Sequence, residues 1–156
     1  MRLGCDSFEA SLPVNGHDYR VAFGPEWPGD AIGFFPALAE QTRQDPETVP
    51  WGGAMIEKAS GAAVGHISCK SLPDEQGRVE IGYGVNPSAE GHGYATEAAS
   101  ALAEWALARP DVRVVTAECL DTNVGSKRVL EKAGFRKVGE RYDAEEGGTL
   151  LLWERG

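Results

Sequence analysis

The most regular alternation of apolar and polar positions lies between residues 94 and 109, directly after the sequence EGHG at 90–93. Its apolar residues recur at helical spacing and are Ala95, Ala98, Ala99, Leu102 and Ala106. This spacing places them on one face of an amphipathic α-helix. Because small side chains dominate the face, we expect the helix to lie close against a sheet. Arg109 suits the negative end of such a helix, and Pro110 ends it.

Shorter apolar and alternating runs before and after this helix predict strands. The expected strands are residues 51–59 and 62–71, joined in a hairpin at Ser60-Gly61, and then 77–85, 110–120, 135–143 and 148–155. Residues 123–134 predict a second helix, with Asn123 as its N-cap and Gly134 just past its end. The pattern therefore favours an α+β fold with a largely antiparallel sheet and one parallel β-α-β crossover.

The first 50 residues give a weaker pattern. Residues 7–23 are typical of two short extended pieces around a turn at Asn15-Gly16, and one or two short helices are expected between residues 29 and 44, interrupted at Pro36. A chain of 156 residues, 42% of them hydrophobic, suits one domain over residues 1–156.

Charge and cysteine content narrow the classes of partner and compartment. The net charge of −9, from 15 Lys and Arg against 24 Asp and Glu, disfavours wide contact with nucleic acid. There is no long apolar run and no leader-like segment, so we expect no membrane partner and a cytoplasmic protein. The three cysteines, Cys5, Cys69 and Cys119, form no CxxC pair, and we expect no metal site.

The glycines before the long helix suggest a binding site. No Ser, Asp or Asn stands at the cap position, so the first amides of the helix lack an obvious partner. Free amides at a helix N-terminus attract anions, and Gly91 and Gly93 would let a bulky diphosphate approach. A purely structural turn explains the two glycines about equally well. Neither a Walker A loop nor a complete dinucleotide fingerprint is present.

The preceding strand has two contrasting faces. Alternation puts Val79, Ile81, Tyr83 and Val85 on an apolar face and Glu80, Gly82 and Gly84 on the other. Interior glycines weaken a strand and often mark the close approach of a ligand, which would here leave space beside Glu80. The alternative is a surface glutamate on a half-exposed strand.

Strand, glycine turn and helix together resemble the Gcn5-related N-acetyltransferase superfamily. Its signature, Arg/Gln-x-x-Gly-x-Gly/Ala, is matched at Gly93 and Ala95, whereas Glu90 stands where Arg or Gln is usual. The segments VEIGYGV, GYATEA, NVGS at 123–126 and VLEKAGF are similar to the branch of ribosomal-protein N-terminal acetyltransferases. The resemblance covers residues 51–154 well and the first 50 hardly at all.

The resemblance implies a sheet with helices on both faces and acetyl-CoA as co-substrate. Residues 51–154 would form the cofactor-binding core and residues 1–50 the acceptor side. The diphosphate would bind amides of Gly91, His92, Gly93, Tyr94, Ala95 and Thr96. The pantetheine arm would follow the Val85 end of its strand, where a main-chain amide near Val85 would hold the thioester carbonyl.

The resemblance also implies catalytic roles. Glu80 is our candidate general base, directly or through a water. Many relatives carry a tyrosine where this chain has Leu130, so Ser126 is the candidate hydrogen-bond donor to the leaving thiolate, although a first-turn serine also satisfies backbone groups. Asn123 would contact pantetheine, and Lys127 or Arg128 would meet the 3′-phosphate unless they form a solvated face.

Weaker candidates have structural alternatives. His66 is a second possible base but fits a core or surface histidine better, and His92 is expected to act through its backbone. Trp27, Phe34 and Phe35 would line an acceptor pocket or, more simply, belong to the core. We expect Glu90, a carboxylate near the diphosphate, to weaken binding without abolishing it.

Three classes of function follow. The first is transfer of an acetyl group to a primary amine of a small molecule or protein N-terminus, by a monomer or homodimer. The second is a non-catalytic acyl-CoA-binding module of the same fold, favoured by Glu90 and the absent tyrosine. The third, a structural interaction domain, leaves the Glu80 face and the open helix N-terminus unexplained.

Overall fold

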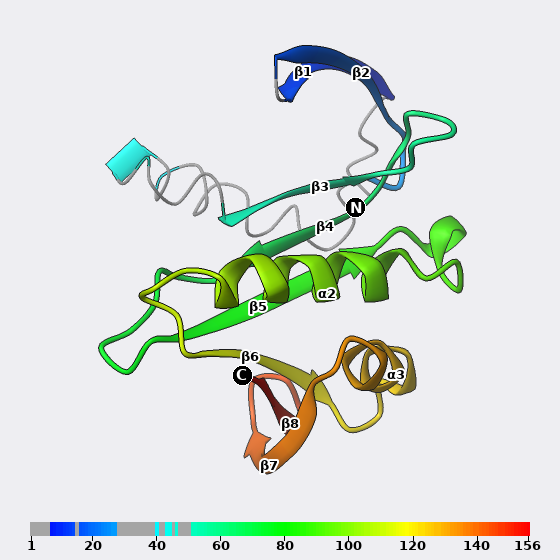
Figure 1. Ribbon diagram of the computed structural model, residues 1–156. Coiled ribbons are helices and arrows are strands. Elements are labelled where there is room, and N and C mark those ends of the chain that lie inside the picture. Colours follow the sequence, from blue (N-terminus) through cyan, green and yellow to red (C-terminus); the bar gives the residue numbers. More distant parts are fainter. Residues whose placement is uncertain (1–6, 15, 28–39, 41–42, 45, 47–50) are drawn as a thin grey trace.

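The computed structural model describes residues 7–14, 16–27, 40, 43–44, 46 and 51–156. In chain order the elements are β1 (Phe8–Val14), β2 (His17–Phe23), β3 (Gly52–Ile56), β4 (Ala63–Cys69), β5 (Arg78–Val85), the short 3-10 helix η3 (Pro87–Ala89), α2 (Tyr94–Leu107), β6 (Val114–Leu120), α3 (Val124–Lys132), β7 (Arg136–Asp143) and β8 (Gly148–Arg155) (Figure 1). Each strand and helix expected from residue 51 onward is present, with ends moved by a few residues.

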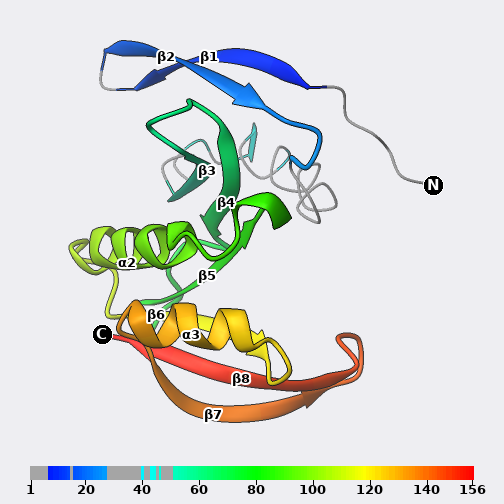
Figure 2. The same cartoon turned by 90° about the vertical axis from the view of Figure 1, so that its right-hand side faces the viewer.

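The main sheet has six strands in the order β3-β4-β5-β6-β8-β7. Its pairs are antiparallel except for β5 and β6, which run parallel through the crossover helix α2. β1 and β2 form a separate antiparallel hairpin that meets the sheet through a bridge between Ala22 and Ala62. Figure 2 shows this hairpin at the opposite end of the molecule from β7 and β8. The predicted α+β topology is therefore confirmed.

The parallel pair β5–β6 is short. It pairs residues 78–80 with 114–116, although β5 continues to Val85 and β6 to Leu120. Beyond this point β5 stays paired with β4 through Val85, and β6 stays paired with β8 through Leu120. Each strand is thus held by a different antiparallel neighbour, and the two diverge toward the α3 end of the molecule (Figure 1).

Helices α2 and α3 pack on the same face of this sheet, whereas the resemblance implied helices on both faces, a part of the prediction that the described residues do not bear out. Their core contacts are with the apolar residues of β5 and β6, and the fully buried members are Val79, Ile81, Ala99, Ala103, Ala106, Val115, Ala117 and Leu130. The helices expected between residues 29 and 44 fall mostly outside the described residues, as do Cys5, Phe34, Phe35 and Pro36. Within the described residues no helix is long and apolar enough to cross a membrane.

Two details of the long helix were predicted wrongly. Its fully buried line is Ala99, Ala103 and Ala106, while Leu102 is only partly buried, so the buried stripe is rotated from the expected one. The helix ends at Leu107, before Arg109. The Arg109 guanidinium instead lies 4.5 Å from the ring centre of Trp51 and 5.5 Å from that of Trp105, where cation–π attraction holds it.

The buried stripe can be tested with a pair of substitutions on α2. Ala103→Leu adds three carbons at a position with no exposed surface, whereas Ala101→Leu adds them at an exposed position of the same helix. We expect Ala103→Leu to lower the free energy of unfolding by about 1–3 kcal/mol. The control should change it by less than about 0.5 kcal/mol. Urea unfolding followed by circular dichroism measures both, and equal effects would contradict this packing.

Candidate active site

A cavity of about 600 Å³ opens at the end of β5, between this strand and α3. The end of β5, the turn that starts α2 and the exposed face of α3 form its walls. Eight residues predicted for the site line it: Val85, Gly91, Gly93, Tyr94, Ala95, Thr96, Asn123 and Ser126. The cavity also has lining residues that the sequence did not single out for binding, among them Tyr83 and Lys132.

The turn before α2 has the geometry that its glycines suggest. Gly91 and Gly93 both have positive φ, at 77° and 86°, a region that strains any residue with a side chain. Gly93 is the N-cap of α2, and no side chain caps the helix. The first helical bond runs from the Glu97 amide to the Gly93 carbonyl. The amides of residues 94–96 donate to no residue in the described part of the chain, which leaves them free for an anion.

Side chains hold this turn from outside the cavity. The His92 ring folds back on the turn, with Nδ1 3.2 Å from the Ala89 carbonyl and 2.9 Å from the Glu90 carbonyl. Both partners are acceptors, so Nδ1 carries the proton. The ring also stacks on Tyr94, whose hydroxyl donates to Glu57 near the end of β3. Unlike the other predicted turn residues, His92 does not line the cavity.

The backbone of β5 presents polar groups to the gap between the strands. The Asn86 amide donates to the Val64 carbonyl at 2.8 Å, and the Glu80 carbonyl accepts from the Lys70 amide at 2.7 Å. Even-numbered residues of β5 thus direct their backbone groups toward β4. Because these groups alternate sides along a strand, those of Tyr83 and Val85 face the other edge, where β6 has separated.

The first turn of α3 brings two hydroxyls together. Asn123 is the N-cap, as predicted, and its Oδ1 accepts from the Ser126 amide at 2.9 Å. The Ser126 Oγ lies 2.8 Å from the Tyr83 hydroxyl. Burial raises the pKa of Tyr83 to about 12, against the opposing effect of this hydrogen bond. Sequence alternation placed Tyr83 on the core face of β5, but nothing in that pattern indicates which residue its hydroxyl meets.

On the α3 side of the cavity the charged lining residues are basic. Arg128 and Lys132 line it, one helical turn apart, and neither forms an ion pair with a described residue. Lys127, the predicted contact, does not line it and pairs instead with Asp121 at 3.2 Å. Glu90 lies on the rim and is exposed. Of the two residues predicted to meet the 3′-phosphate, Arg128 therefore lies on the side of α3 that faces the cavity, and Lys127 does not.

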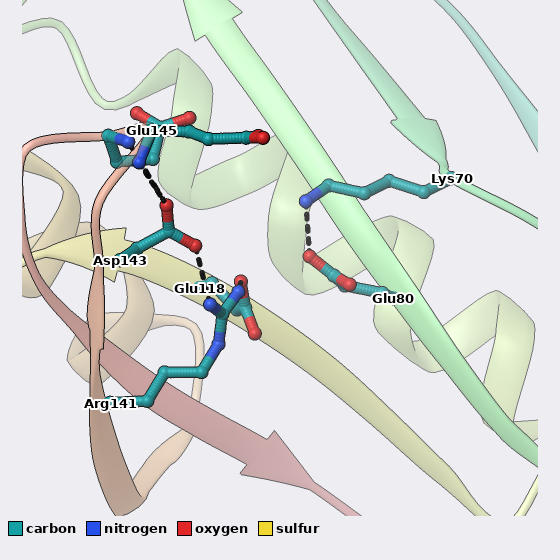
Figure 3. Close-up of polar contacts among 7 residues, drawn as sticks. Lys70, Glu80, Glu118, Arg141, Asp143 and Glu145 are labelled. Atoms are coloured by element: carbon teal, nitrogen blue, oxygen red, sulfur yellow. Dashed lines mark hydrogen bonds and ion pairs between the residues drawn. The ribbon is translucent and has the colours of Figure 1, made fainter.

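Glu80 lies on the other face of the sheet. Its carboxylate is partly buried and forms an ion pair with Lys70, which reaches across β5 to meet it (Figure 3). The separate cluster of Glu118, Arg141 and Asp143 lies on this same face. The cavity does not include Glu80 among its lining residues, and the gap between β5 and β6 begins directly after it.

The expected empty space over Gly82 and Gly84 is occupied by neighbouring side chains. A Cβ on Gly84 would lie 2.6 Å from Cε1 of His66, so this glycine makes room for the His66 ring. A Cβ on Gly82 would lie 3.4 Å from Cε of Lys70, an ordinary van der Waals contact. His66 is half-buried beside Trp27, with ring centres 6.5 Å apart, and burial lowers its pKa. Trp27 is buried with Val21 and Phe23, as expected for a core residue.

Comparison with known proteins identifies the family. The family model described as an acetyltransferase (GNAT) domain matches residues 17–136, and the chain belongs to this family. An uncharacterized N-acetyltransferase of Bacillus subtilis, YjdG, is 36% identical over 114 residues, 70% of this chain and 67% of that protein. A second, YnaD, is 38% identical over 85 residues, 54% of this chain and 49% of that protein. The matched part of the chain thus spans about two thirds of the first relative and about half of the second.

Solved structures agree on the fold. A GNAT-family acetyltransferase from Bacillus anthracis has a TM-score of 0.58 at 28% identity, covering 64% of this chain and 62% of that one. The ribosomal-protein-S5-alanine acetyltransferase of Vibrio fischeri has a TM-score of 0.66 at 17% identity, covering 79% and 70%. The aminoglycoside acetyltransferase AAC(6')-Ib in complex with coenzyme A has a TM-score of 0.54 at 20% identity, covering 62% and 61%. The family uses acetyl-CoA as co-substrate. Among the described residues, no group of three His, Cys, Asp or Glu side chains is placed to hold a metal ion.

Gly93 and Gly147 offer a matched pair for testing the turn. Both have positive φ, at 86° and 68°, and an added Cβ meets nothing within 4 Å at either position. Gly147 lies in the turn between β7 and β8, so Gly147→Ala adds similar backbone strain outside the cavity. We expect Gly93→Ala to weaken acetyl-CoA binding at least about tenfold, or about 1.4 kcal/mol, by calorimetry. Gly147→Ala should bind as the wild type does, and equal losses would refute the turn as the binding site.

Proposed function

We propose that this chain transfers the acetyl group of acetyl-CoA to a primary amine of a small molecule or a protein N-terminus, with the thioester in the gap between β5 and β6. The observation that carries this proposal is the early end of the β5–β6 ladder at Glu80 and Thr116. It leaves the backbone groups of Tyr83 and Val85 directed into an open gap. A preorganised amide there suits the carbonyl oxygen, which gains negative charge as the amine attacks.

The co-substrate would bind mainly through backbone groups. The amides of residues 91–96, of which those of 94–96 have no partner among the described residues, receive the diphosphate at the positive end of α2. Asn123, which lines the cavity while capping α3, contacts the pantetheine arm. Arg128 and Lys132 attract the phosphates, including the 3′-phosphate, and Glu90 opposes them. Lys127 is the less favoured phosphate contact because of its pairing with Asp121.

The acceptor must lose a proton to attack. At pH 7 a lysine-type amine with a pKa near ~10.4 is about one part in 2,500 free base, and an α-amine near ~7.8 is about one part in seven. We assign Glu80 to receive this proton, directly or through a water. Its ion pair with Lys70 must then open or shift when a cationic acceptor arrives. His66, on the same face, is the next candidate.

The bonding changes balance within this site. A cationic acceptor first loses one proton to Glu80, which releases it to solvent. The neutral amine nitrogen then forms a bond to the acetyl carbon, its second proton passes to Glu80, and the carbon–sulfur bond breaks. The departing thiolate of coenzyme A accepts a hydrogen bond from Ser126. A serine hydroxyl is a weak acid, so its contribution is hydrogen bonding to the thiolate, which is protonated later from solvent.

The acceptor side is assigned to the face of Glu80 and to residues 1–50. The packing of Trp27 near His66 favours this assignment, because it brings the N-terminal part of the chain onto that face. The net charge of −9 favours cationic acceptors. The names of two structural neighbours, an alanine acetyltransferase and an aminoglycoside acetyltransferase, represent the two acceptor classes in this proposal. A cytoplasmic location is consistent with free, buried Cys69 and Cys119.

Glu80→Gln tests the base. The substitution keeps the size of the side chain and removes its ability to take a proton. Loss of a general base costs roughly 10²–10⁴ in rate, so turnover near neutral pH should fall at least about tenfold even if water partly substitutes. The defect should shrink as the pH rises, because more of the acceptor is then already neutral. Release of coenzyme A with a panel of small amines and short peptides measures this effect.

Lys70→Met is the control, because it breaks the same ion pair and leaves the carboxylate in place. We expect it to keep most of the turnover. Equal losses in both variants would mean that the ion pair matters for structure alone, and wild-type turnover by Glu80→Gln would assign the base elsewhere, with His66 next. If acetyl-CoA raises the melting temperature but no amine releases coenzyme A, the non-catalytic binding module replaces this proposal.

A further inference from the structure

We propose that Tyr83 is a positioning residue that holds the Ser126 hydroxyl so that its proton is directed at the leaving sulfur. This inference rests on the proposed function and assigns a role to a residue outside the set predicted from the sequence. It concerns a contact between β5 and α3 that spans the widening gap, at the wall of the cavity assigned to the thioester.

The geometry fixes Ser126 from two directions. Its amide donates to Asn123 Oδ1 at 2.9 Å, which sets its backbone at the start of α3. Its Oγ lies 2.8 Å from the Tyr83 hydroxyl, which sets the side chain. The phenol comes from the partly buried face of β5, where its ring packs against the core cluster that includes Val79 and Leu130. A rigid ring on a strand therefore anchors a short side chain that would otherwise rotate freely.

Either hydroxyl of the pair can donate, and the proposal takes Tyr83 as the donor; its hydroxyl also lies 3.4 Å from the Ser126 carbonyl oxygen, a second acceptor. Each hydroxyl has one proton and can accept as well as donate. With its pKa raised to about 12 by burial, the Tyr83 phenol stays protonated throughout the neutral range. When Tyr83 donates to the Ser126 Oγ, the serine proton is left free for another acceptor. Hydrogen bonds in such a chain strengthen one another, so the serine becomes a better donor than it would be alone.

Other groups near α3 cannot take this role. The cavity's second phenol, Tyr94, donates to Glu57 on the far side of the turn. Leu130, one turn further along α3 than Ser126, is fully buried and has no polar side-chain atom. A serine in the first turn of a helix commonly satisfies nearby backbone groups, yet among the described residues the Ser126 Oγ forms its hydrogen bond with the Tyr83 hydroxyl.

The test is a double-mutant cycle with Tyr83→Phe, Ser126→Ala and both together. Tyr83→Phe removes only the hydroxyl and keeps the ring in the core. We expect each single variant to lower kcat about fivefold to twentyfold, and the double variant to lose no more than Ser126→Ala does. KM for acetyl-CoA, and its Kd by calorimetry, should stay within about twofold of the wild type. Tyr142→Phe, which removes the hydroxyl of a tyrosine 72% exposed on β7, is the control and should be neutral.

Each other outcome overturns the inference. A Tyr83→Phe variant with the wild-type kcat shows that the hydroxyl is unnecessary. Multiplicative losses in the double variant show that Tyr83 acts independently of Ser126. A raised Kd with unchanged kcat makes Tyr83 a binding residue. If the wild type turns over no amine, the proposed function and this inference fall together, whereas wild-type turnover beside any of the first three results removes the inference alone.

Discussion

The short parallel ladder between β5 and β6 is the constraint on which the rest of the structure depends. It joins only residues 78–80 to 114–116, because β4 and β8 hold the later parts of the two strands and draw them apart. A longer ladder would satisfy the backbone of β5 and close the gap. A shorter one would disconnect the two halves of the sheet, since this is the pairing through which they meet. The candidate site thus lies beyond the point at which the parallel pairing of β5 with β6 ends.

The two faces of the sheet beside this gap differ in chemistry. On the side of α2 and α3 the wall carries free amides, hydroxyls and two cations, which suits a phosphorylated thioester. On the other side lie Glu80 and the ion pairs of Lys70 and Arg141, which suit a cationic amine. Under the proposed function, the two reactants approach from opposite faces of the sheet and meet between the strands. Charge repulsion between the anionic co-substrate and the acidic face then keeps each reactant on its own side.

Local sequence patterns predict the strands, the helices and the faces of β5. They do not predict which side chains of distant elements meet. Alternation in β5 was enough to separate Val79 and Ile81 from Glu80, and the cap residues bounded α3 correctly at Asn123 and Gly134. Contacts between distant elements could not be predicted from these patterns. Tyr83 and Ser126 lie 43 positions apart, and the local sequence around either residue does not indicate that the two hydroxyls meet. Likewise, the space beside Glu80 looked open because the residues that fill it, His66 and Lys70, come from the neighbouring strand and its end.

Recognition through the backbone of β5 and the turn has a consequence for how such a protein can change over evolutionary time. Amides of Val85 and residues 94–96 are supplied by almost any amino acid, so under the proposed function most mutations there would leave the co-substrate contacts intact, and only the positive-φ positions demand glycine. The acceptor face is built from side chains, each of which can be exchanged singly. A lineage with this architecture can therefore acquire new acceptors while its donor chemistry remains the same.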